Sequence, residues 1–192
     1  MTLGRRAFGI AESYSGADST ETSTLAGAVV RADRTVEDFA FGSCTVGGRD
    51  ATDAIVDLFE RLDRPDVRYL FVAGVALSWY NVVDLHAVHR AVERPVFAVS
   101  FEESDGLEAG IDDAFDGSER TARREVYDGL PDRHRLPVED PLFVRSLGVD
   151  RATAADVVEA YTEKRRPEPL RVAKRLARRV DTARRDGTIV PE

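Results

Sequence analysis

A cluster of carboxylates follows an apolar segment in the middle of the sequence. Glu102, Glu103 and Asp105 come directly after the run PVFAVSF at residues 95–101. Three acids at the end of a strand could bind a metal ion or hydroxyl groups, because hard cations prefer oxygen ligands. A solvated turn is the alternative, since such turns are common in acidic proteins.

Two adjacent aromatic residues, Trp79 and Tyr80, form a second candidate site in the segment SWYN. They lie just beyond the apolar run at residues 67–77, and ligands of open α/β sheets bind beyond the carboxyl ends of strands. An aromatic ring in that position could stack on a nucleobase. A lid over the core and a small-molecule pocket around Trp79 are the alternatives.

A basic helix is predicted at about residues 168–186, where Pro169 suits the first turn because its missing N–H would have had no partner there. Helical spacing places Ala173, Leu176 and Ala177 on an inward face. The basic residues of the outward face are Arg171, Lys174, Arg175, Arg178 and Arg179. This face could contact phosphates of a nucleic acid. A solvated face paired with surface acids is the alternative.

The composition indicates one folded domain with an acidic surface. A chain of 192 residues can bury one core and is short for two. We therefore expect a single domain over residues 1–192, with the terminal helix packed on it. The formal net charge is −8, and only two of the 27 basic residues, Lys164 and Lys174, are lysines. This pattern is typical of a salt-loving archaeon. In strong salt, counterion release contributes little to binding, so the net charge does not exclude a nucleic-acid partner.

Several classes of protein are disfavoured. No apolar run approaches the roughly 20 residues of a membrane span, and the single Cys44 fits a reducing cytosol. We therefore expect a cytoplasmic protein without a membrane partner. His86 and His89 lack a third ligand for structural zinc. The sequence also lacks a GxSxG motif, a Walker loop and a dinucleotide fingerprint, which disfavours serine hydrolases, nucleotidases and dehydrogenases.

The order of predicted elements indicates an α/β fold with a mixed sheet. Apolar patterns predict strands at 6–11, 25–32, 37–46, 67–77, 95–101 and 141–148, and helices at 51–62, 81–93, 118–130, 152–163 and 168–186. The first three strands could form an antiparallel meander. The strand–helix–strand units that follow require parallel pairing and right-handed crossovers. This order is that of the ribonuclease H-like fold, and a plain doubly wound fold is the alternative.

Five segments of the sequence resemble one known family in the same order. They are GIAES at 9–13, TVGGRDAT at 45–52, SWYNVVD at 78–84, FEESDGLE at 101–108 and PEPLRVA at 167–173. They resemble endonuclease V, a metal-dependent nuclease that acts on deaminated bases. The similarity is greater to archaeal relatives of that enzyme grouped as domain of unknown function 99. The resemblance covers nearly the whole chain and implies a ribonuclease H-like fold.

The resemblance also implies carboxylates clustered around Mg²⁺ or Mn²⁺. Asp50 matches the acid expected near the start of the first helix. The acid expected on the first strand falls on Ala11, with Glu12 beside it, and the acid of a later strand falls on Ala73. A histidine of endonuclease V falls on Val149. The family's site is therefore matched only in part.

The candidate metal ligands and catalytic residues of this chain are Glu12, Asp50 and Asp84, which could converge because the ends of the first and fourth strands are adjacent in this fold. Glu12 can serve only if the first strand has ended before it, because neighbouring strand residues point to opposite faces. Each residue has a structural alternative: Glu12 as a loop acid, Asp50 as a helix N-cap with Asp53 three residues later, and Asp84 as an exposed helix acid.

Two functions follow from these patterns. The first is a Mg²⁺-dependent endonuclease that acts on strands with deaminated or altered bases, with DNA as the favoured partner and a role in DNA repair. Trp79, Tyr80, Arg171, Lys174, Arg175 and Arg178 would contact the nucleic acid. The second is a non-catalytic module for nucleic acid or a small ligand, which kept the fold and lost the metal site.

Overall fold

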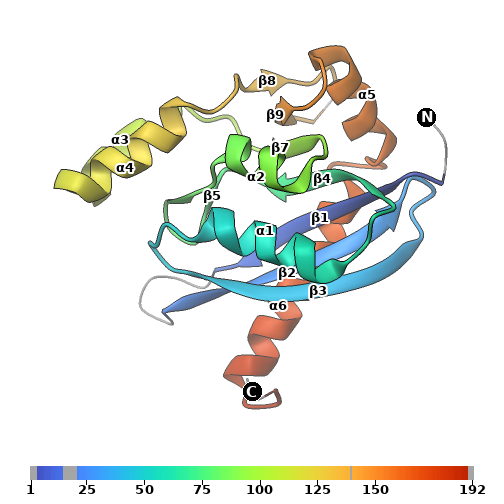
Figure 1. Ribbon diagram of the computed structural model, residues 1–192, viewed down its shortest axis with the longest axis horizontal. Coiled ribbons are helices and arrows are strands. Elements are labelled where there is room, and N and C mark those ends of the chain that lie inside the picture. The colour runs from blue at the N-terminus through green and yellow to red at the C-terminus, as the bar shows by residue number, and fades with distance from the viewer. Residues whose placement is uncertain (1–3, 15–20, 139, 190–192) are drawn as a thin grey trace.

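The computed structural model describes residues 4–14, 21–138 and 140–189. Over these residues, seven strands form one mixed sheet in the order β3-β2-β1-β4-β7-β9-β8, flanked by six helices (Figure 1). The strands of this sheet are β1 (Arg6–Ser13), β2 (Thr22–Arg31), β3 (Val36–Thr45), β4 (Val67–Ala73), β7 (Val96–Ser100), β8 (His134–Arg135) and β9 (Phe143–Leu147). The helices are α1 (Ala51–Leu62), α2 (Leu85–Val92), α3 (Glu108–Ala114), α4 (Gly117–Asp128), α5 (Arg151–Ala160) and α6 (Glu168–Arg185).

The pairing of the strands confirms the predicted mixed sheet. β2 pairs antiparallel with both β1 and β3, which is the expected meander. β1 pairs parallel with β4, and β4 pairs parallel with β7, so the strand–helix–strand units have the orientation that a crossover connection requires. β9 returns antiparallel to β7. The carboxyl ends of β1, β4 and β7 therefore lie at the same edge of the sheet.

Alternation along β1 divides the core between the two faces of the sheet. Phe8 and Ile10 pack into the core on the side of α1 and α2, whereas Ala11 packs under α6 with Ala173. Figure 1 shows α1 and α2 in front of the sheet and α6 behind it. The three-layer arrangement follows from strands that are apolar on both faces, as parallel central strands usually are.

One segment differs from the sequence-based expectation. The predicted strand at 67–77 ends at Ala73, and a separate hairpin of β5 (Ala76–Leu77) and β6 (Asn81–Val82) follows it. The helix predicted from residue 81 begins only at Leu85. Gly74 has a φ of +89° and breaks the strand, which the continuous apolar run concealed.

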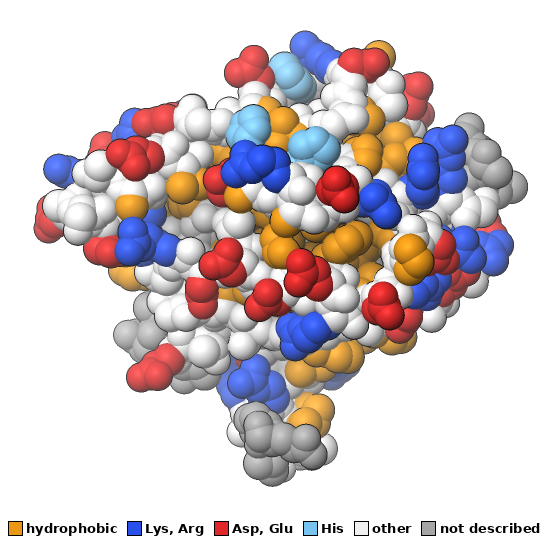
Figure 2. Space-filling model, viewed as in Figure 1, with side chains coloured by type: hydrophobic (Ala, Val, Ile, Leu, Met, Phe, Trp, Pro, Cys, Tyr) orange, Lys and Arg blue, Asp and Glu red, His pale blue; other side chains and the backbone are white. Residues whose placement is uncertain are grey.

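The surface agrees with an acidic composition. Acidic side chains gather over α1 on the face shown in Figure 2, where Asp53, Asp57 and Glu60 are exposed. A search of the described helices found none with the length and apolar character that crossing a membrane requires.

Candidate functional site

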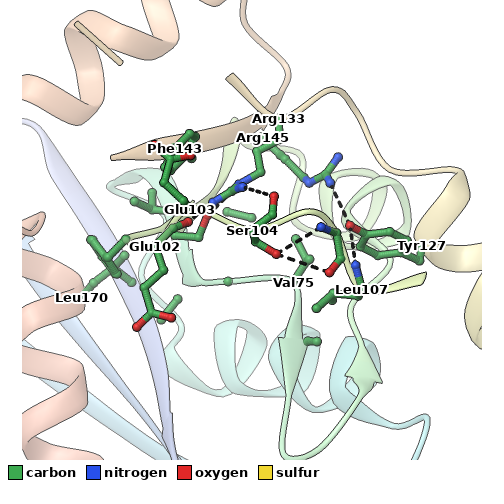
Figure 3. Close-up of a pocket in the computed structure, with 18 of the residues that line it drawn as sticks. Val75, Glu102, Glu103, Ser104, Leu107, Tyr127, Arg133, Phe143, Arg145 and Leu170 are labelled. Carbon is green, nitrogen blue, oxygen red and sulfur yellow. Dashed lines mark hydrogen bonds between the residues drawn. The ribbon is translucent and has the colours of Figure 1, made fainter. Parts of the chain in front are cut away.

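A cavity of about 930 Å³ opens at the carboxyl ends of β4 and β7. Ala73 and Gly74 line it from β4, and Ser100 lines it from β7. The segment 101–108, β9 and α6 form its other walls (Figure 3). This is the edge at which ligands bind in open α/β sheets.

Six cationic side chains from different elements line this cavity. They are Arg133, Arg135, Arg145, Arg166, Lys174 and Arg178. Within the described ranges, none of the six forms an ion pair with a carboxylate. Guanidinium groups that hold no carboxylate keep donors for an anionic ligand, and arginine suits phosphate because of its planar set of donors.

Neutral groups hold two of these arginines in place. Arg133 donates to the hydroxyl of Ser100 at 3.1 Å and to the carbonyl of Ser104 at 3.3 Å, and its guanidinium lies 3.8 Å from the centre of the Phe143 ring. Arg145 donates to the carbonyl of Pro131 at 2.5 Å. Figure 3 shows Arg133 and Arg145 side by side above the loop that carries Ser104. Burial and the charge of Arg145 lower the pKa of Arg133. The hydrogen bonds to neutral groups hold these two like charges in place.

Lys174 adds an amine to the α6 wall of the cavity. The side chain is half-buried, and its Nζ donates a hydrogen bond of 2.6 Å to the backbone carbonyl of Glu12. Burial lowers the pKa of Lys174; nearby Glu12 opposes this effect, whereas the charges of Arg178 and Arg166 add to it. The other lysine, Lys164, is exposed and does not line the cavity.

The acids of the segment FEESDGLE lie at the rim of the same cavity. Glu102, Glu103 and Asp105 all line it, as their position after a strand predicted. In Figure 3 the carboxylate of Glu102 extends away from Arg133, on the side of Leu170. The carboxylates of this segment and the arginines of other elements therefore surround one opening.

The segment SWYN forms the turn of the β5–β6 hairpin in an unusual conformation. Ser78, Trp79 and Tyr80 have φ values of 42°, 60° and 59°. The left-handed region costs an ordinary residue about 1–2 kcal/mol, so three in succession need support from their surroundings. Trp79 is 43% exposed. Neither aromatic residue lines the cavity, and their contact with a nucleobase stays a prediction.

Buried Arg123 of α4 supports this turn. It is 2% exposed and donates to the carbonyls of Tyr80 at 3.1 Å and Gly48 at 3.0 Å, and also to the carbonyl of Gly47. Its guanidinium stacks 3.7 Å from the centre of the Phe115 ring, which also contacts Trp79 with centroids 5.2 Å apart. One arginine therefore ties the loop before α1 to the aromatic turn.

Glu12 lies on the opposite face of the sheet from Ala11. Strand β1 continues through Ser13, so the condition that it end before Glu12 is not met. The Glu12 carboxylate accepts hydrogen bonds from the hydroxyl of Ser78 at 2.6 Å and from that of Ser23 at 2.8 Å. Ala11 is fully buried under α6. The Glu12 carboxylate therefore lies on the other face of the sheet from the position that the resemblance assigns to an acid at Ala11.

Asp50 occupies the N-cap position of α1, but its side chain makes no capping hydrogen bond and is engaged by other neighbours. Its carboxylate accepts from the hydroxyl of Thr45 at 2.7 Å and from the amide of Asn81 at 2.6 Å. Burial raises its pKa, but these hydrogen bonds outweigh the effect and hold the pKa of Asp50 below its usual range. The side-chain oxygen of buried Asn81 accepts a hydrogen bond from the N–H of Ala51 instead. A residue distant in sequence therefore provides the acceptor for the first backbone N–H of α1.

Asp84 is the N-cap of α2, and its carboxylate accepts from the N–H of Ala87 at 3.0 Å. Among the described residues, no group of three or more His, Cys, Asp or Glu side chains could hold a metal ion. The structure therefore does not bring Glu12, Asp50 and Asp84 into one metal centre. Each carboxylate is held by hydrogen bonds to its own neighbours. Their role as ligands stays a prediction.

The basic face of α6 divides into two parts. Arg171 forms an ion pair with Glu168, with a hydrogen bond of 2.6 Å. Lys174 and Arg178 line the cavity, whereas Arg175 is exposed and does not. Helical spacing found these residues, but it could not assign them to a cavity that also receives arginines from β8, β9 and the segment before α6.

Residues 4–181 match the protein family described as Endonuclease dU. This chain belongs to the Endonuclease dU family. A UPF0215 protein of Pyrobaculum calidifontis is 36% identical to this Endonuclease dU family member over 170 residues, which cover 88% of this chain and 92% of that protein.

Comparison with solved structures relates the fold of this Endonuclease dU family member to known folds. A protein of unknown function from Archaeoglobus fulgidus superposes with a TM-score of 0.81 at 24% identity, covering 92% of this chain and 98% of that one. Endonuclease V of Ciona intestinalis, bound to DNA that contains an inosine, has a TM-score of 0.61 at 15% identity, covering 93% of this chain and 86% of that one. This Endonuclease dU family member therefore has an endonuclease V-like fold.

Proposed function

We propose that this protein binds a nucleic-acid strand in the arginine-lined cavity and acts as an endonuclease on strands that carry a deaminated base. The cation set of the cavity carries the binding proposal, because none of its members forms an ion pair with a carboxylate of the described residues. Arginines in a concave site at the carboxyl ends of strands suit a phosphodiester backbone.

The choice of substrate is supported by the relatives. The family is described as Endonuclease dU, and a related fold binds DNA with an inosine. Uracil and hypoxanthine are both products of base deamination. DNA with a deaminated base is therefore the substrate proposed for this chain, and an altered base unpairs at lower cost than a normal one.

Binding is tested by removing two exposed cavity cations together. Arg135→Gln with Arg178→Gln is expected to weaken binding of a labelled single strand by about tenfold, since each lost phosphate contact also removes counterion release. Both side chains are exposed, so the fold should tolerate the change. Fluorescence anisotropy over a range of KCl concentrations measures the affinity and its salt slope.

The matched control replaces Arg175 and Arg179 with glutamine. These two arginines are also exposed and lie on α6, but they do not line the cavity. The net charge changes by the same amount in both double variants. Equal loss of affinity in the two would place binding on the outer helix face and contradict the cavity.

The catalytic part of the proposal keeps Asp50, Glu12 and Asp84 as candidate residues and Mg²⁺ or Mn²⁺ as the candidate cofactor. The described residues do not fit a shared metal centre, because Ala11 and Ala73 carry only methyl groups and the three carboxylates are separately engaged. What this chain's own residues supply is a basic cavity that orients a strand.

A cleavage assay tests the endonuclease. A strand with uracil or hypoxanthine, incubated with Mg²⁺ or Mn²⁺ at low and molar salt, is expected to be cut faster than a normal strand. A catalytic role of Asp50 predicts that Asp50→Asn abolishes the product and any increase in melting temperature caused by the metal. Asp53→Asn, a change at an exposed acid in the first turn of α1, is the control. Cleavage that persists in Asp50→Asn would remove Asp50 from catalysis.

A binding module without metal-dependent catalysis is the second candidate. The observation that favours it is the pair of alanines, Ala11 and Ala73, at positions where the resemblance implies carboxylates. Folded protein that binds the strand in the cavity and yields no metal-dependent product would support this candidate.

A further inference from the structure

We propose that Lys174 is an amine nucleophile that attacks the aldehyde of an abasic site and so cleaves the strand by elimination. This activity rests on the proposed binding of a nucleic acid in the cavity. It differs from the proposed cleavage of strands that carry a deaminated base, because the substrate here has lost its base altogether. The group that the cavity would bind is an aldehyde flanked by two phosphodiesters.

The position of Lys174 supports this role. Its amine lies on the cavity wall and is held by the carbonyl of Glu12. The nearby core on this side of the sheet includes Ala11, Ala73 and Ala173, whose methyl groups offer the amine no ion-pair partner. A half-buried amine at a cavity wall is positioned to meet a bound carbonyl group.

The other cations of the cavity supply binding, not nucleophilic attack. They are all arginines, and a guanidinium remains protonated in proteins and serves as a donor to phosphate. A lysine amine forms Schiff bases with carbonyl substrates. The lining of the cavity therefore combines one lysine amine with several arginine donors for phosphate, which is the combination that an abasic strand requires.

The proposed steps balance without an oxidant or reductant. The Nζ of Lys174 adds to C1′ of the ring-opened sugar, and loss of water gives an iminium ion. A rim carboxylate, for which Glu102 is the candidate, removes a proton from C2′. The electron pair then expels the 3′ phosphate as the C3′–O bond breaks. Water hydrolyses the remaining imine and returns the amine.

Borohydride trapping tests this proposal directly. Reduction of the iminium ion fixes the protein to a labelled strand that carries an aldehydic abasic site, and the adduct migrates slowly in a denaturing gel. The wild-type protein is expected to form the adduct, and Lys174→Arg is expected to lose it. Arginine retains the charge and can still donate to the carbonyl of Glu12, so the fold should be kept.

The sequence offers a matched control because it contains only two lysines. Lys164→Arg changes the exposed lysine outside the cavity and is expected to leave adduct formation unchanged. Mass spectrometry of the adduct should locate the strand on the peptide that contains Lys174. An adduct that persists in Lys174→Arg, or that maps to Lys164 or the N-terminal amine, would overturn the proposal.

A strand with a tetrahydrofuran residue separates this proposal from the binding proposal. This analogue lacks the aldehyde, so it reports binding alone. Wild-type protein that binds the analogue but forms no adduct with the aldehydic strand would refute the role of Lys174 and leave binding intact. Protein that is folded and does not bind the analogue would refute the cavity as a nucleic-acid site. Equal binding of the analogue by Lys174→Arg shows that its lost adduct reflects chemistry.

Discussion

Replacing Gly9 with alanine is expected to lower the free energy of unfolding by about 3 kcal/mol, at the upper end of the cost of overpacking a core. A Cβ at Gly9 would lie 2.4 Å from the backbone carbonyl carbon of Pro169. Backbone atoms cannot rotate away as a side chain can, so the first turn of α6 would have to move off β1. Denaturant unfolding at high salt measures the effect.

Gly4→Ala is the matched control for this change. Among the described residues, no heavy atom other than those of its chain neighbours lies within 4 Å of a Cβ built at Gly4. The same glycine-to-alanine replacement should therefore change stability by only a few tenths of a kcal/mol there. Similar unfolding midpoints for Gly9→Ala and Gly4→Ala would contradict the close approach of α6 to β1. Because α6 carries Lys174 and Arg178, weaker nucleic-acid binding should accompany the loss of stability.

Replacing Arg123 with glutamine is expected to release the turn of the β5–β6 hairpin. The shorter side chain cannot reach the carbonyls of Gly47, Gly48 and Tyr80 that Arg123 now satisfies. Leaving three acceptors without this donor should cost roughly 3 kcal/mol, at about 1 kcal/mol each. The strained conformation of the turn adds to the effect, because its support is removed.

Fluorescence reports this change because Trp79 is the only tryptophan of the chain. We expect a shifted emission spectrum and a lower unfolding midpoint for Arg123→Gln. Arg120→Gln, at an exposed position of the same helix, should alter neither. An unchanged Trp79 spectrum in a destabilised Arg123→Gln variant would mean that the turn keeps its conformation without the arginine.

The sequence predicted the regular elements well where periodicity was strong. The helix at 51–62 begins and ends where expected, because its apolar positions repeat at helical spacing. The prediction was less accurate at 67–83, where a continuous apolar run hid a strand end and a hairpin. The left-handed residues of that hairpin are not glycines, so no local residue type indicated the turn. The short α3 was also missed.

The candidate site was only partly predictable for a different reason. Helical spacing identified Lys174 and Arg178, and the strand end identified Glu102. Arg133 and Arg145 could not be assigned from sequence, because they join the cavity only when β8 and β9 fold back against β7. The pairing of Asp50 with Asn81 likewise depends on tertiary contact. Local patterns predict elements, whereas sites built from several elements require the topology.

The contact between Gly9 and Pro169 has a consequence for how the protein reaches its native state. It joins the first strand to the last helix of the structure, and contacts between residues so distant in sequence tend to form late and slow folding. Until α6 docks, the face of the meander that includes Ala11, Ala28 and Val30 lacks its cover, and exposed apolar faces of folding intermediates favour aggregation. The wall that carries Lys174 is completed in the same step. Affinity for a nucleic-acid strand should therefore emerge only at the end of refolding, after most of the sheet has formed.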